Sequence, residues 1–369
     1  MSFPLPTPKV SVILPTYKVE PFFAQCIESV MASTLKEIEI IPVDDGSPDA
    51  CGAMMDAYAQ RDARIRPIHQ TNGGYGKAVN AGLAVAQGAY IAIIETDDVM
   101  KPTFLETLYQ LAEKHQADVA KADFYYYRGG RDVIPRRRLR HVAPEGEVFT
   151  LDEKPELLIG HVSIWSALYR RDFLESNAIR FEETAGASYQ DGPFAYRVYA
   201  AGAKIVLSHQ HGVYYRMGET HQSSSINNQS LGLMQIIHQS WKAREILREA
   251  QRYEAVKEAF FRQAGSPCFL FFAQLANEHR PVYFEALQAL FRQGQQDGVT
   301  FQYFSTPSDT ALLEALWQNN LQAAVDWCIQ TQQAEALRYR HRQRWYAKFT
   351  KHQWMLIVGG RVLLNIHTD

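Results

Sequence analysis

Residues 69–98 read HQTNGGYGKAVNAGLAVAQGAYIAIIETDD and carry four local signals in order. Asn72 to Lys77 is rich in glycine, and apolar residues at helical spacing follow over residues 79–86. Tyr90 to Ile94 is an unbroken apolar run, which predicts a strand buried on both faces. Glu95 to Asp98 then places three acids in four residues. Loop, helix, strand and polar strand end together predict one unit of an alternating strand–helix fold.

The same alternation continues on both sides of this stretch. Further strands are predicted at Val10–Leu14, Ile38–Val43, Ile65–His69 and Val119–Tyr127, and helices at Phe22–Met31, Asp49–Ala59 and after Pro102. Short loops between such elements predict an α/β fold, with a mostly parallel sheet and helices on both faces. Two more strands are expected at Ile164–Tyr169 and Ala203–Leu207, with a helix between Gly192 and Ala201.

Polar residues follow four of the predicted strands, at the point where each strand ends. They are Pro15-Thr16-Tyr17, Asp44-Asp45, Asn72 to Lys77 and Glu95 to Asp98. Ligands of open α/β sheets bind outside the carboxyl ends of the strands, so these clusters predict one shared site. Asp and Asn also favour turns for local reasons. The convergence of four clusters on one sheet edge favours the site.

The acidic cluster predicts a metal–phosphate site. Neighbouring carboxylates repel unless a cation joins them, and Mg²⁺ is held by one or two carboxylates together with substrate phosphates. A nucleotide diphosphate would supply those phosphates. An acid-rich helix start is the alternative for Asp98, because Lys101-Pro102 begins a helix just after it.

The glycine-rich loop would let backbone N–H groups approach an anion. It lacks the spacing of a P-loop or of a dinucleotide-binding fingerprint, which argues against a dehydrogenase. Lys77 is a phosphate partner or a solvated lysine at the start of the helix.

Five stretches together resemble family 2 glycosyltransferases of the GT-A type. They are KVSVILPTYKVEPFFAQCIESV (9–30), IEIIPVDDGSPD (38–49), residues 69–98, SALYRRDFL (166–174) and YQDGPF (189–194), so the resemblance covers about residues 9–220. It implies a GT-A fold and transfer of a sugar from a nucleotide-sugar, usually a UDP-sugar, with inversion and with Mn²⁺ or Mg²⁺. The expected setting is synthesis of a bacterial surface polysaccharide or lipid-linked oligosaccharide.

The resemblance also assigns the donor residues. They are Pro15, Thr16, Tyr17, Glu20, Asp44, Asp45, Asn72, Gly73, Gly74, Lys77, Glu95, Thr96 and Asp97. Asp45 is expected to accept from the uracil ring, and Asp97 to bind the metal with Glu95 and His221. In two places the chain departs from the family pattern. Glu95 replaces the usual first Asp of D-x-D, and Val79 stands where an Arg is usual, which leaves Lys77 as its substitute.

Asp191 matches the family's catalytic base, and Trp165, Asp98 and Gln190 are assigned to the acceptor. A helix N-cap is the alternative for Asp191, since Asp-Gly-Pro is also a good helix start. A buried core ring is the alternative for Trp165. For His221 a surface loop is the alternative to metal binding.

The chain is expected to divide into a catalytic domain, residues 1–228, and a helical C-terminal region, residues 229–369. Residues 336–355 contain Arg, Lys and aromatic residues but no Asp or Glu. A basic aromatic helix suits an anionic membrane surface, and a helix docked on the domain is the alternative. With no signal-peptide pattern and no Cys-x-x-Cys pair, the expected location is cytoplasmic, at the inner membrane face if the tail binds lipid.

Composition limits the partners. The formal net charge of −2 over 369 residues gives no basic excess for nucleic acid, so the expected partners are a nucleotide-sugar and a glycan or lipid-linked acceptor. Two other functions stay open. One is a non-catalytic nucleotide-sugar-binding scaffold. The other is a sugar-phosphate nucleotidylyltransferase, although such enzymes carry an Arg-containing glycine loop where this chain has Leu14 to Tyr17.

Overall fold

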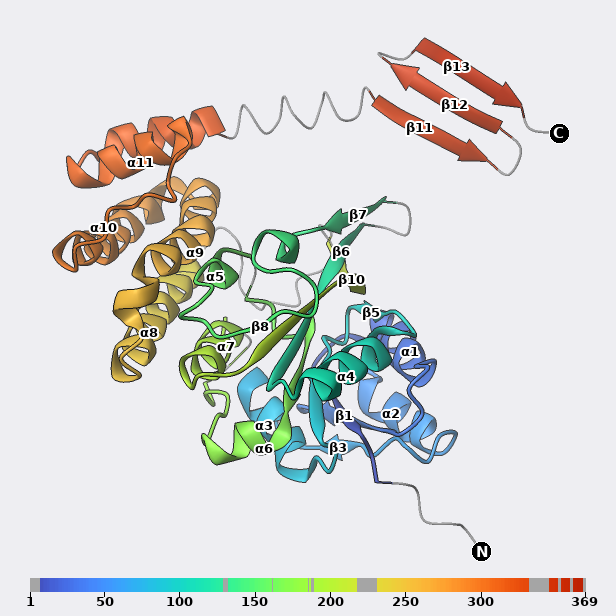
Figure 1. Ribbon diagram of the computed structural model, residues 1–369. Helices are drawn as coiled ribbons and strands as arrows, with labels where there is room; N and C mark the ends of the chain where they lie inside the picture. The colour runs from blue at the N-terminus through green and yellow to red at the C-terminus, as the bar shows by residue number, and fades with distance from the viewer. Residues whose placement is uncertain are drawn as a thin grey trace, which may run out of the picture.

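The computed structural model describes residues 7–128, 132–160, 162–184, 186, 189–217, 231–331, 345–350, 353–358 and 361–367 (Figure 1). Its centre is a mixed sheet flanked by helices, followed by a set of C-terminal helices. The sheet strands are β1 (Val10–Thr16), β2 (Ile38–Asp44), β3 (Ile68–His69), β4 (Tyr90–Ile93), β5 (Val99–Met100), β6 (Val119–Arg128), β7 (Asp132–Arg136), β8 (Val148–Phe149), β9 (Ala167–Arg170) and β10 (Ile205–Arg216).

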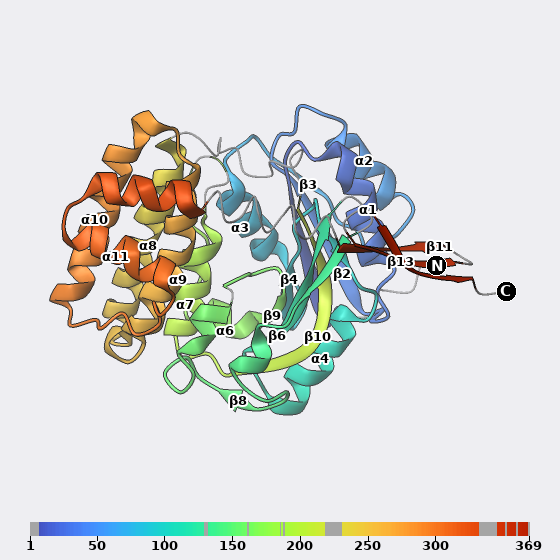
Figure 2. The same cartoon turned by 90° about the horizontal axis from the view of Figure 1, so that it is seen from above.

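Helices cover both faces of this sheet, as the strand–helix alternation predicts. They are α1 (Glu20–Met31), α2 (Cys51–Ala59), α3 (Tyr75–Val85), α4 (Phe104–His115), α5 (Glu156–Gly160), α6 (Arg171–Ser176) and α7 (Asp191–Ala200). Figure 2 shows α1, α2 and α4 on one side of the sheet and α3, α6 and α7 on the other. Every residue of β1 and β2 is buried, which is why both strands are apolar almost throughout.

The strand order is β3-β2-β1-β4-β9-β6-β10-β5. The pairs β2–β3, β1–β2, β1–β4 and β6–β10 are parallel. Strand β9 lies between β4 and β6 and is antiparallel to both. The predicted α/β class is confirmed. The sheet is mixed instead of mostly parallel, because β5, β7 and β8 also pair antiparallel with their neighbours. Because β1, β2 and β4 are parallel neighbours, their carboxyl ends lie together at one edge.

The C-terminal helices pack against α5 and α7. They are α8 (Gln235–Glu249), α9 (Tyr253–Gln274), α10 (Arg280–Gln296) and α11 (Pro307–Trp317). The ring of Tyr196 on α7 meets that of Phe260 on α9 edge to face, with centroids 5.9 Å apart. Lys242 of α8 forms an ion pair with Glu182, which also binds Arg197 of α7 at 2.9 Å. The helices and the sheet domain therefore share one core.

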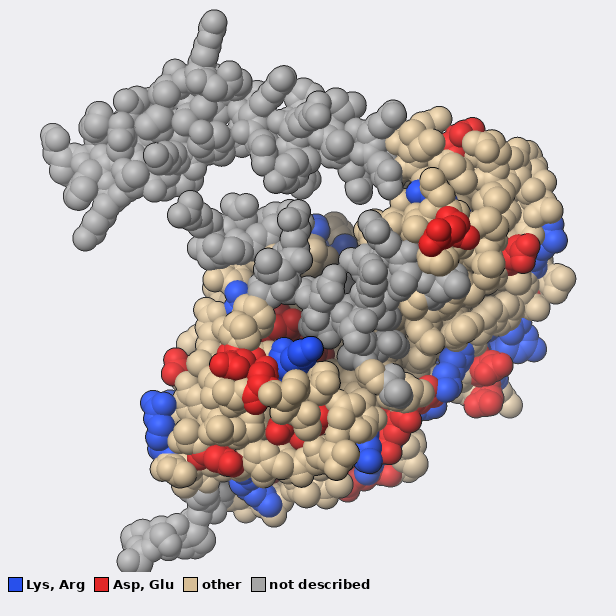
Figure 3. Space-filling view, turned by 180° about the vertical axis from the view of Figure 1, so that it is seen from behind, with Lys and Arg blue, Asp and Glu red and all other residues tan. Residues whose placement is uncertain are grey.

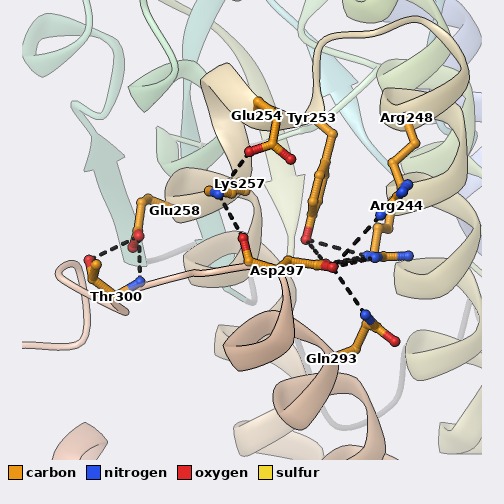
Figure 4. Close-up of polar contacts among 9 residues, drawn as sticks. All are labelled: Arg244, Arg248, Tyr253, Glu254, Lys257, Glu258, Gln293, Asp297 and Thr300. Carbon is orange, nitrogen blue, oxygen red and sulfur yellow. Dashed lines mark hydrogen bonds and ion pairs between the residues drawn. The ribbon is translucent and has the colours of Figure 1, made fainter.

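Asp297, just after α10, joins three of these helices (Figure 4). Its carboxylate accepts hydrogen bonds from Arg244 of α8 at 2.6 Å and from the Tyr253 hydroxyl of α9, also at 2.6 Å. Gln293 of α10 donates to it at 3.0 Å. Burial acts to raise the pKa of Asp297, but these donors outweigh it and hold that pKa below its usual value.

Residues 229–369 were expected to be helical to their end. That expectation is wrong for the described residues after 344, which form strands. Residues 345–350, 353–358 and 361–367 form β11 (Trp345–Thr350), β12 (Gln353–Val358) and β13 (Arg361–His367), an antiparallel sheet. In β11 the apolar residues Trp345, Ala347 and Phe349 alternate with others, which is the period of a strand. Residues 332–344, with most of the basic run, lie outside the described residues. So does the predicted boundary at residue 228.

No helix in the described part of the chain combines the length and the apolar character needed to span a bilayer. On the face seen in Figure 3, basic and acidic side chains are interspersed over the described residues.

Candidate active site

A cavity of about 880 Å³, including space open to solvent, lies at the carboxyl ends of β1, β2 and β4. Nine of the predicted donor residues line it: Pro15, Thr16, Tyr17, Asp45, Asn72, Gly74, Glu95, Thr96 and Asp97. Val19, Tyr75, Ala78 and Gly186 complete the lining. The sheet topology brings the nine donor residues together, because they lie at or after the ends of β1, β2, β3 and β4, and β1 is the parallel neighbour of both β2 and β4. We refer to this cavity as the donor pocket.

The glycine-rich loop is organised around Asp45. One carboxylate oxygen of Asp45 accepts from the backbone N–H of Gly73 at 2.9 Å, and the other from that of Gly74 at 2.8 Å. The side-chain amide of Gln70 donates to the same carboxylate at 2.7 Å. The loop does bind an anion through its backbone N–H groups, as its composition predicts, but in this structure that anion is a carboxylate of the chain itself.

The glycines also let the loop pack against the segment that precedes Asp191. The backbone N–H of Tyr75 donates to the carbonyl of Gly186 at 3.0 Å. Gly74 has a φ of +93°, and a Cβ there would overlap the carbonyl oxygen of Thr184. A Cβ on Gly76 would overlap the carbonyl oxygen of Glu182. Glycine is required at both positions by this close backbone approach, and at Gly74 also by the positive φ.

Glu95 lines the donor pocket and is held in place by Tyr75. The Tyr75 hydroxyl donates to Oε1 of Glu95 at 2.7 Å. Burial raises the pKa of Glu95 to about 8, the Tyr75 hydrogen bond opposes this rise, and the charges of Asp97 and Asp191 add to it. The Thr96 hydroxyl donates to the carbonyl of Pro15 at 2.9 Å, which ties the acidic motif to the end of β1.

Asp97 and Asp98 differ in their surroundings. Asp97 lines the donor pocket, whereas Asp98 is buried and accepts from the backbone N–H of Arg216 at 2.7 Å. Burial, with the charge of Asp97, raises the pKa of Asp98 well above its usual value. The Arg216 guanidinium donates to the carbonyl of Asp97 at 2.7 Å, so the end of β10 is fastened to the acidic motif. Asp98, which the resemblance assigns to the acceptor, anchors the backbone of Arg216 in this structure.

The acids present fit a divalent cation that shares its coordination with phosphates. Within the described ranges, His, Cys, Asp and Glu side chains form no group of three or more that could hold a metal ion. A protein-only cage is therefore absent from that part of the chain. Mg²⁺ is usually held by one or two carboxylates, with substrate phosphate and water completing the shell. Asp97, with Glu95 beside it, matches that arrangement. His221 lies outside the described residues.

Four predicted donor residues do not line the donor pocket. The lining excludes Glu20, Asp44, Gly73 and Lys77. Two of them hold nearby backbone: Glu20 accepts from the N–H of Ala50 at 3.1 Å, and Asp44 from that of Ser47 at 2.8 Å. Lys77 is exposed and its side chain lies over Gly73.

Asp191 is the first residue of α7, at the predicted junction between loop and helix. Burial raises its pKa, and the backbone N–H of Gly192 opposes that rise. Its charge also raises the pKa of the Tyr75 hydroxyl, after the larger effect of burial. Asp191 therefore lies close enough to the donor pocket to interact electrostatically with two residues that line it, Tyr75 and Glu95.

The two remaining acceptor assignments are buried side chains. Trp165 is 5% exposed and is stacked on the ring of Tyr215, with centroids 4.8 Å apart. The alternative of a core ring describes this geometry. Gln190 donates to the Thr184 hydroxyl at 2.7 Å, so it braces the turn before Asp191. Tyr189 in that turn has a φ of +60°, a strained conformation for a residue with a side chain.

Sequence reasoning missed a buried lysine beside Trp165. Lys121 of β6 donates to the Ser163 carbonyl, and to the Ser163 and Ser166 hydroxyls at 3.0 Å each. Burial lowers the pKa of Lys121 to about 7, against the opposing charge of Asp123. The only signal in the sequence was a pair of charged residues, Lys121 and Asp123, inside a mainly apolar strand.

Comparisons with known proteins agree with this architecture. Residues 11–177 match the family described as Glycosyl transferase family 2. The glycosyltransferase EpsJ of Bacillus subtilis is 35% identical over 209 residues, which cover 54% of this chain and 58% of EpsJ. The succinoglycan biosynthesis protein ExoW of Rhizobium meliloti is 28% identical over 260 residues, covering 66% of this chain and 80% of ExoW. The chain thus spans little more than half the length of EpsJ.

Among solved structures, residues 1–349 of TarS from S. aureus, in complex with UDP-GlcNAc, superpose with a TM-score of 0.67. The identity is 20%, and the match covers 94% of this chain and 96% of that one. The likeness shows the fold, which is GT-A with C-terminal helices, as predicted.

Proposed function

Because residues 11–177 belong to glycosyl transferase family 2, we propose that this chain transfers a sugar from a nucleotide-sugar, a UDP-sugar, to an acceptor hydroxyl. The observation that carries the proposal is the donor pocket, with Asp45, Glu95 and Asp97 in its wall and Asp191 electrostatically close by. Its position outside the carboxyl ends of three parallel strands is where α/β folds bind nucleotides. The UDP-GlcNAc complex of the structurally similar TarS supports a UDP-linked donor.

In the proposed reaction Asp191 is the general base. It accepts the proton of the acceptor hydroxyl while that oxygen forms a bond to the anomeric carbon of the donor. The bond from the anomeric carbon to the diphosphate breaks in the same step, on the opposite face, so the configuration inverts. A pKa raised by burial brings a carboxylate closer to working pH, which favours base catalysis. A divalent cation at Asp97, when bound, would stabilise the charge that develops on the leaving diphosphate.

The proposed setting is the synthesis of a bacterial surface polysaccharide, with a glycan or lipid-linked acceptor. ExoW, whose name gives succinoglycan biosynthesis, supports this setting. Contact of residues 336–355 with an anionic membrane surface at the inner face of the cytoplasmic membrane remains part of the proposal. Flotation of the full chain with anionic vesicles, compared with a chain ending at Gln330, tests it. Equal flotation of the two chains would exclude a role for the tail.

The test of the activity is a donor screen. UDP-, GDP- and dTDP-linked sugars are incubated with the full chain and Mn²⁺ or Mg²⁺, and the released nucleotide is measured. We expect release from a UDP-sugar, and its loss in the Asp97→Ala variant. Tight UDP-sugar binding without turnover for any acceptor would instead indicate a scaffold. Formation of nucleotide-sugar from a sugar phosphate and UTP would indicate a nucleotidylyltransferase.

A further inference from the structure

A second cavity, of about 770 Å³ including open space, lies between α7 and the C-terminal helices. Asp191, Gly192, Pro193 and Tyr196 of α7 line one side, and Val162 and Tyr189 belong to the same wall. Helices α8 and α9 supply the other side with Ile236, Gln239, Ser240, Ala243, Phe260, Gln263, Ala264 and Pro267. We call it the interhelix pocket. Asp191, the proposed base, lines it, but the interhelix pocket shares no lining residue with the donor pocket.

The wall of the interhelix pocket is aromatic and nearly uncharged. Tyr189, Tyr196 and Phe260 contribute rings. Among the described lining residues, Asp191 is the one side chain that carries a charge when ionised near neutral pH. Next to Asp191 the wall is open: a Cβ built on Gly192 would meet no atom within 4 Å. Aromatic rings with room beside them suit a ligand that presents the apolar face of a ring, and the absence of Lys and Arg from this described lining disfavours an anionic one.

Two hydrogen-bond acceptors in this wall lack their usual donors. The side-chain oxygen Oε1 of Gln239 is buried and has no hydrogen-bond partner among the described residues. Pro267 lies inside α9 and has no N–H, so the carbonyl of Gln263, four residues earlier, loses its helical donor. Both residues line the interhelix pocket. A buried acceptor left unpaired costs about 1–3 kcal/mol, so a ligand that donates a hydrogen bond to Oε1 of Gln239 would remove that cost.

We propose that the interhelix pocket binds a neutral pyranose unit of the acceptor, whose hydroxyls donate to the Gln239 side chain and the Gln263 carbonyl. The proposal rests on the proposed function, since it assigns the acceptor class of that same reaction. An alkyl chain would leave the buried Gln239 oxygen unpaired, and a uronic acid or phosphate would meet Asp191 without a compensating cation in the described wall. A sugar ring supplies both a face for the aromatic residues and the missing donors.

The position of Asp191 connects the two cavities. Asp191 lines the interhelix pocket, and its charge raises the pKa values of Glu95 and Tyr75, which line the donor pocket. A hydroxyl of a ring in the interhelix pocket would therefore meet the base on the side away from the nucleotide. The interhelix pocket is then built from α7, α8 and α9, and of its described lining only Val162 lies within residues 11–177, which match the family.

The test measures direct binding of simple glycosides to the full chain by saturation-transfer NMR. The probes are the methyl glycosides of glucose, galactose, mannose and N-acetylglucosamine, with methyl glucuronide and octanol as the charged and alkyl alternatives. The variants are Gln239→Leu, which removes the acceptor atom, and Ala264→Phe, which fills the pocket from α9. Gln295→Leu makes the same chemical change at an exposed position of α10 and is the control.

We expect at least one neutral glycoside to bind, about tenfold more weakly to Gln239→Leu and not measurably to Ala264→Phe, with Gln295→Leu unchanged. Thermal unfolding identifies a variant that fails to fold, and Gln239→Leu then decides the test. The proposal is overturned if no neutral glycoside binds, if binding survives both pocket changes, or if the glucuronide or octanol is preferred. UDP binding, measured separately, should stay unchanged. If the unaltered chain does not bind UDP, that result counts against the proposed function and not against the interhelix pocket.

Discussion

The carboxylate of Asp45 and the backbone amide of Gly74 are joined by a hydrogen bond of 2.8 Å. Asp45 follows β2 and Gly74 precedes α3, so this bond fixes two sides of the donor pocket to each other. With Gly73 and Gln70 also donating, the carboxylate has three partners within the chain. Hydrogen bonds to a charged group are among the stronger ones in proteins, so the shape of the donor pocket depends on Asp45.

Replacing Asp45 with Asn should weaken donor binding, because the amide nitrogen cannot accept from the loop N–H groups. We expect the dissociation constant for UDP to rise about tenfold, the effect of losing one charge-assisted hydrogen bond. Calorimetric titration with UDP measures it. Asp172→Asn, the same change at an exposed position, is the control. Unchanged UDP affinity in Asp45→Asn would show that the loop keeps its shape without the carboxylate.

Replacing Gly74 with Ala should destabilise the chain by about 2 kcal/mol or more, because the methyl group adds backbone overlap to a strained φ. Gly298→Ala is the matched control. Its φ is +73°, but the nearest atom to its Cβ, Nζ of Lys257, is 3.7 Å away. It should cost only the strain, about 1 kcal/mol. Thermal or urea unfolding compares the two. Equal losses would mean that contact with Thr184 contributes nothing.

Replacing Asp191 with Asn should leave UDP-sugar binding intact and lower kcat by a factor of about 10²–10⁴, the usual contribution of a general base. Stopped assays of nucleotide release with acceptor, together with donor titration, separate the two effects. An intact unfolding transition excludes a purely structural loss at the start of α7. Near-normal transfer in this variant would remove Asp191 from the role of base.

Replacing Asp97 with Ala should abolish the dependence of donor binding on added Mn²⁺ or Mg²⁺. We expect UDP to bind the variant weakly and equally with metal or with chelator, whereas the unaltered chain should bind it more tightly with metal. Asp49→Ala is the control for the loss of a negative charge, because Asp49 is an acid that follows β2 and does not line the donor pocket. A metal-dependent increase in affinity that persists in Asp97→Ala would assign the metal to other ligands.

Asp297 predicts a pH-dependent contribution to stability. Its folded-state pKa lies below the unfolded value of about 3.9, so its stabilisation is present above that pH and is lost as pH falls through the folded pKa. Asp297→Asn should therefore lower the free energy of unfolding by about 1–3 kcal/mol at pH 7, and by clearly less near pH 3. Urea unfolding at the two pH values measures this difference. An equal loss at both values would mean that the charge of Asp297 is unimportant.

Much of the fold and of the donor pocket was predictable because both depend on local patterns. An apolar run such as Tyr90 to Ile94 is buried wherever it lies, and parallel strands bring their polar ends together. Glu95, Asp97 and Asn72 were found in this way. The direction of β9 was not, because a four-residue strand such as Ala167–Arg170 carries no sign of which neighbour it pairs with.

The internal partners of the site residues depend on tertiary contacts and left no mark in the sequence. Nothing local to Asp45 shows that Gly73 and Gly74 use its carboxylate, and nothing local to Tyr75 shows its bond to Glu95. Lys121 is similar, since its serine partners lie 42 and 45 positions away. The interhelix pocket required the packing of α8 and α9 on α7, which periodicity alone does not give.

Pro267 of α9 lines the proposed acceptor site, which lies in a different part of the chain from the proposed donor site. The residues proposed to bind the nucleotide lie, apart from Gly186, within residues 11–177, which match the family, whereas the wall around Pro267 lies beyond them. Exchanging α8 and α9 between relatives should then alter which glycan is extended without altering which sugar is donated. Under the proposed function, a change confined to two helices is then enough to alter the acceptor, while the donor pocket stays as it is.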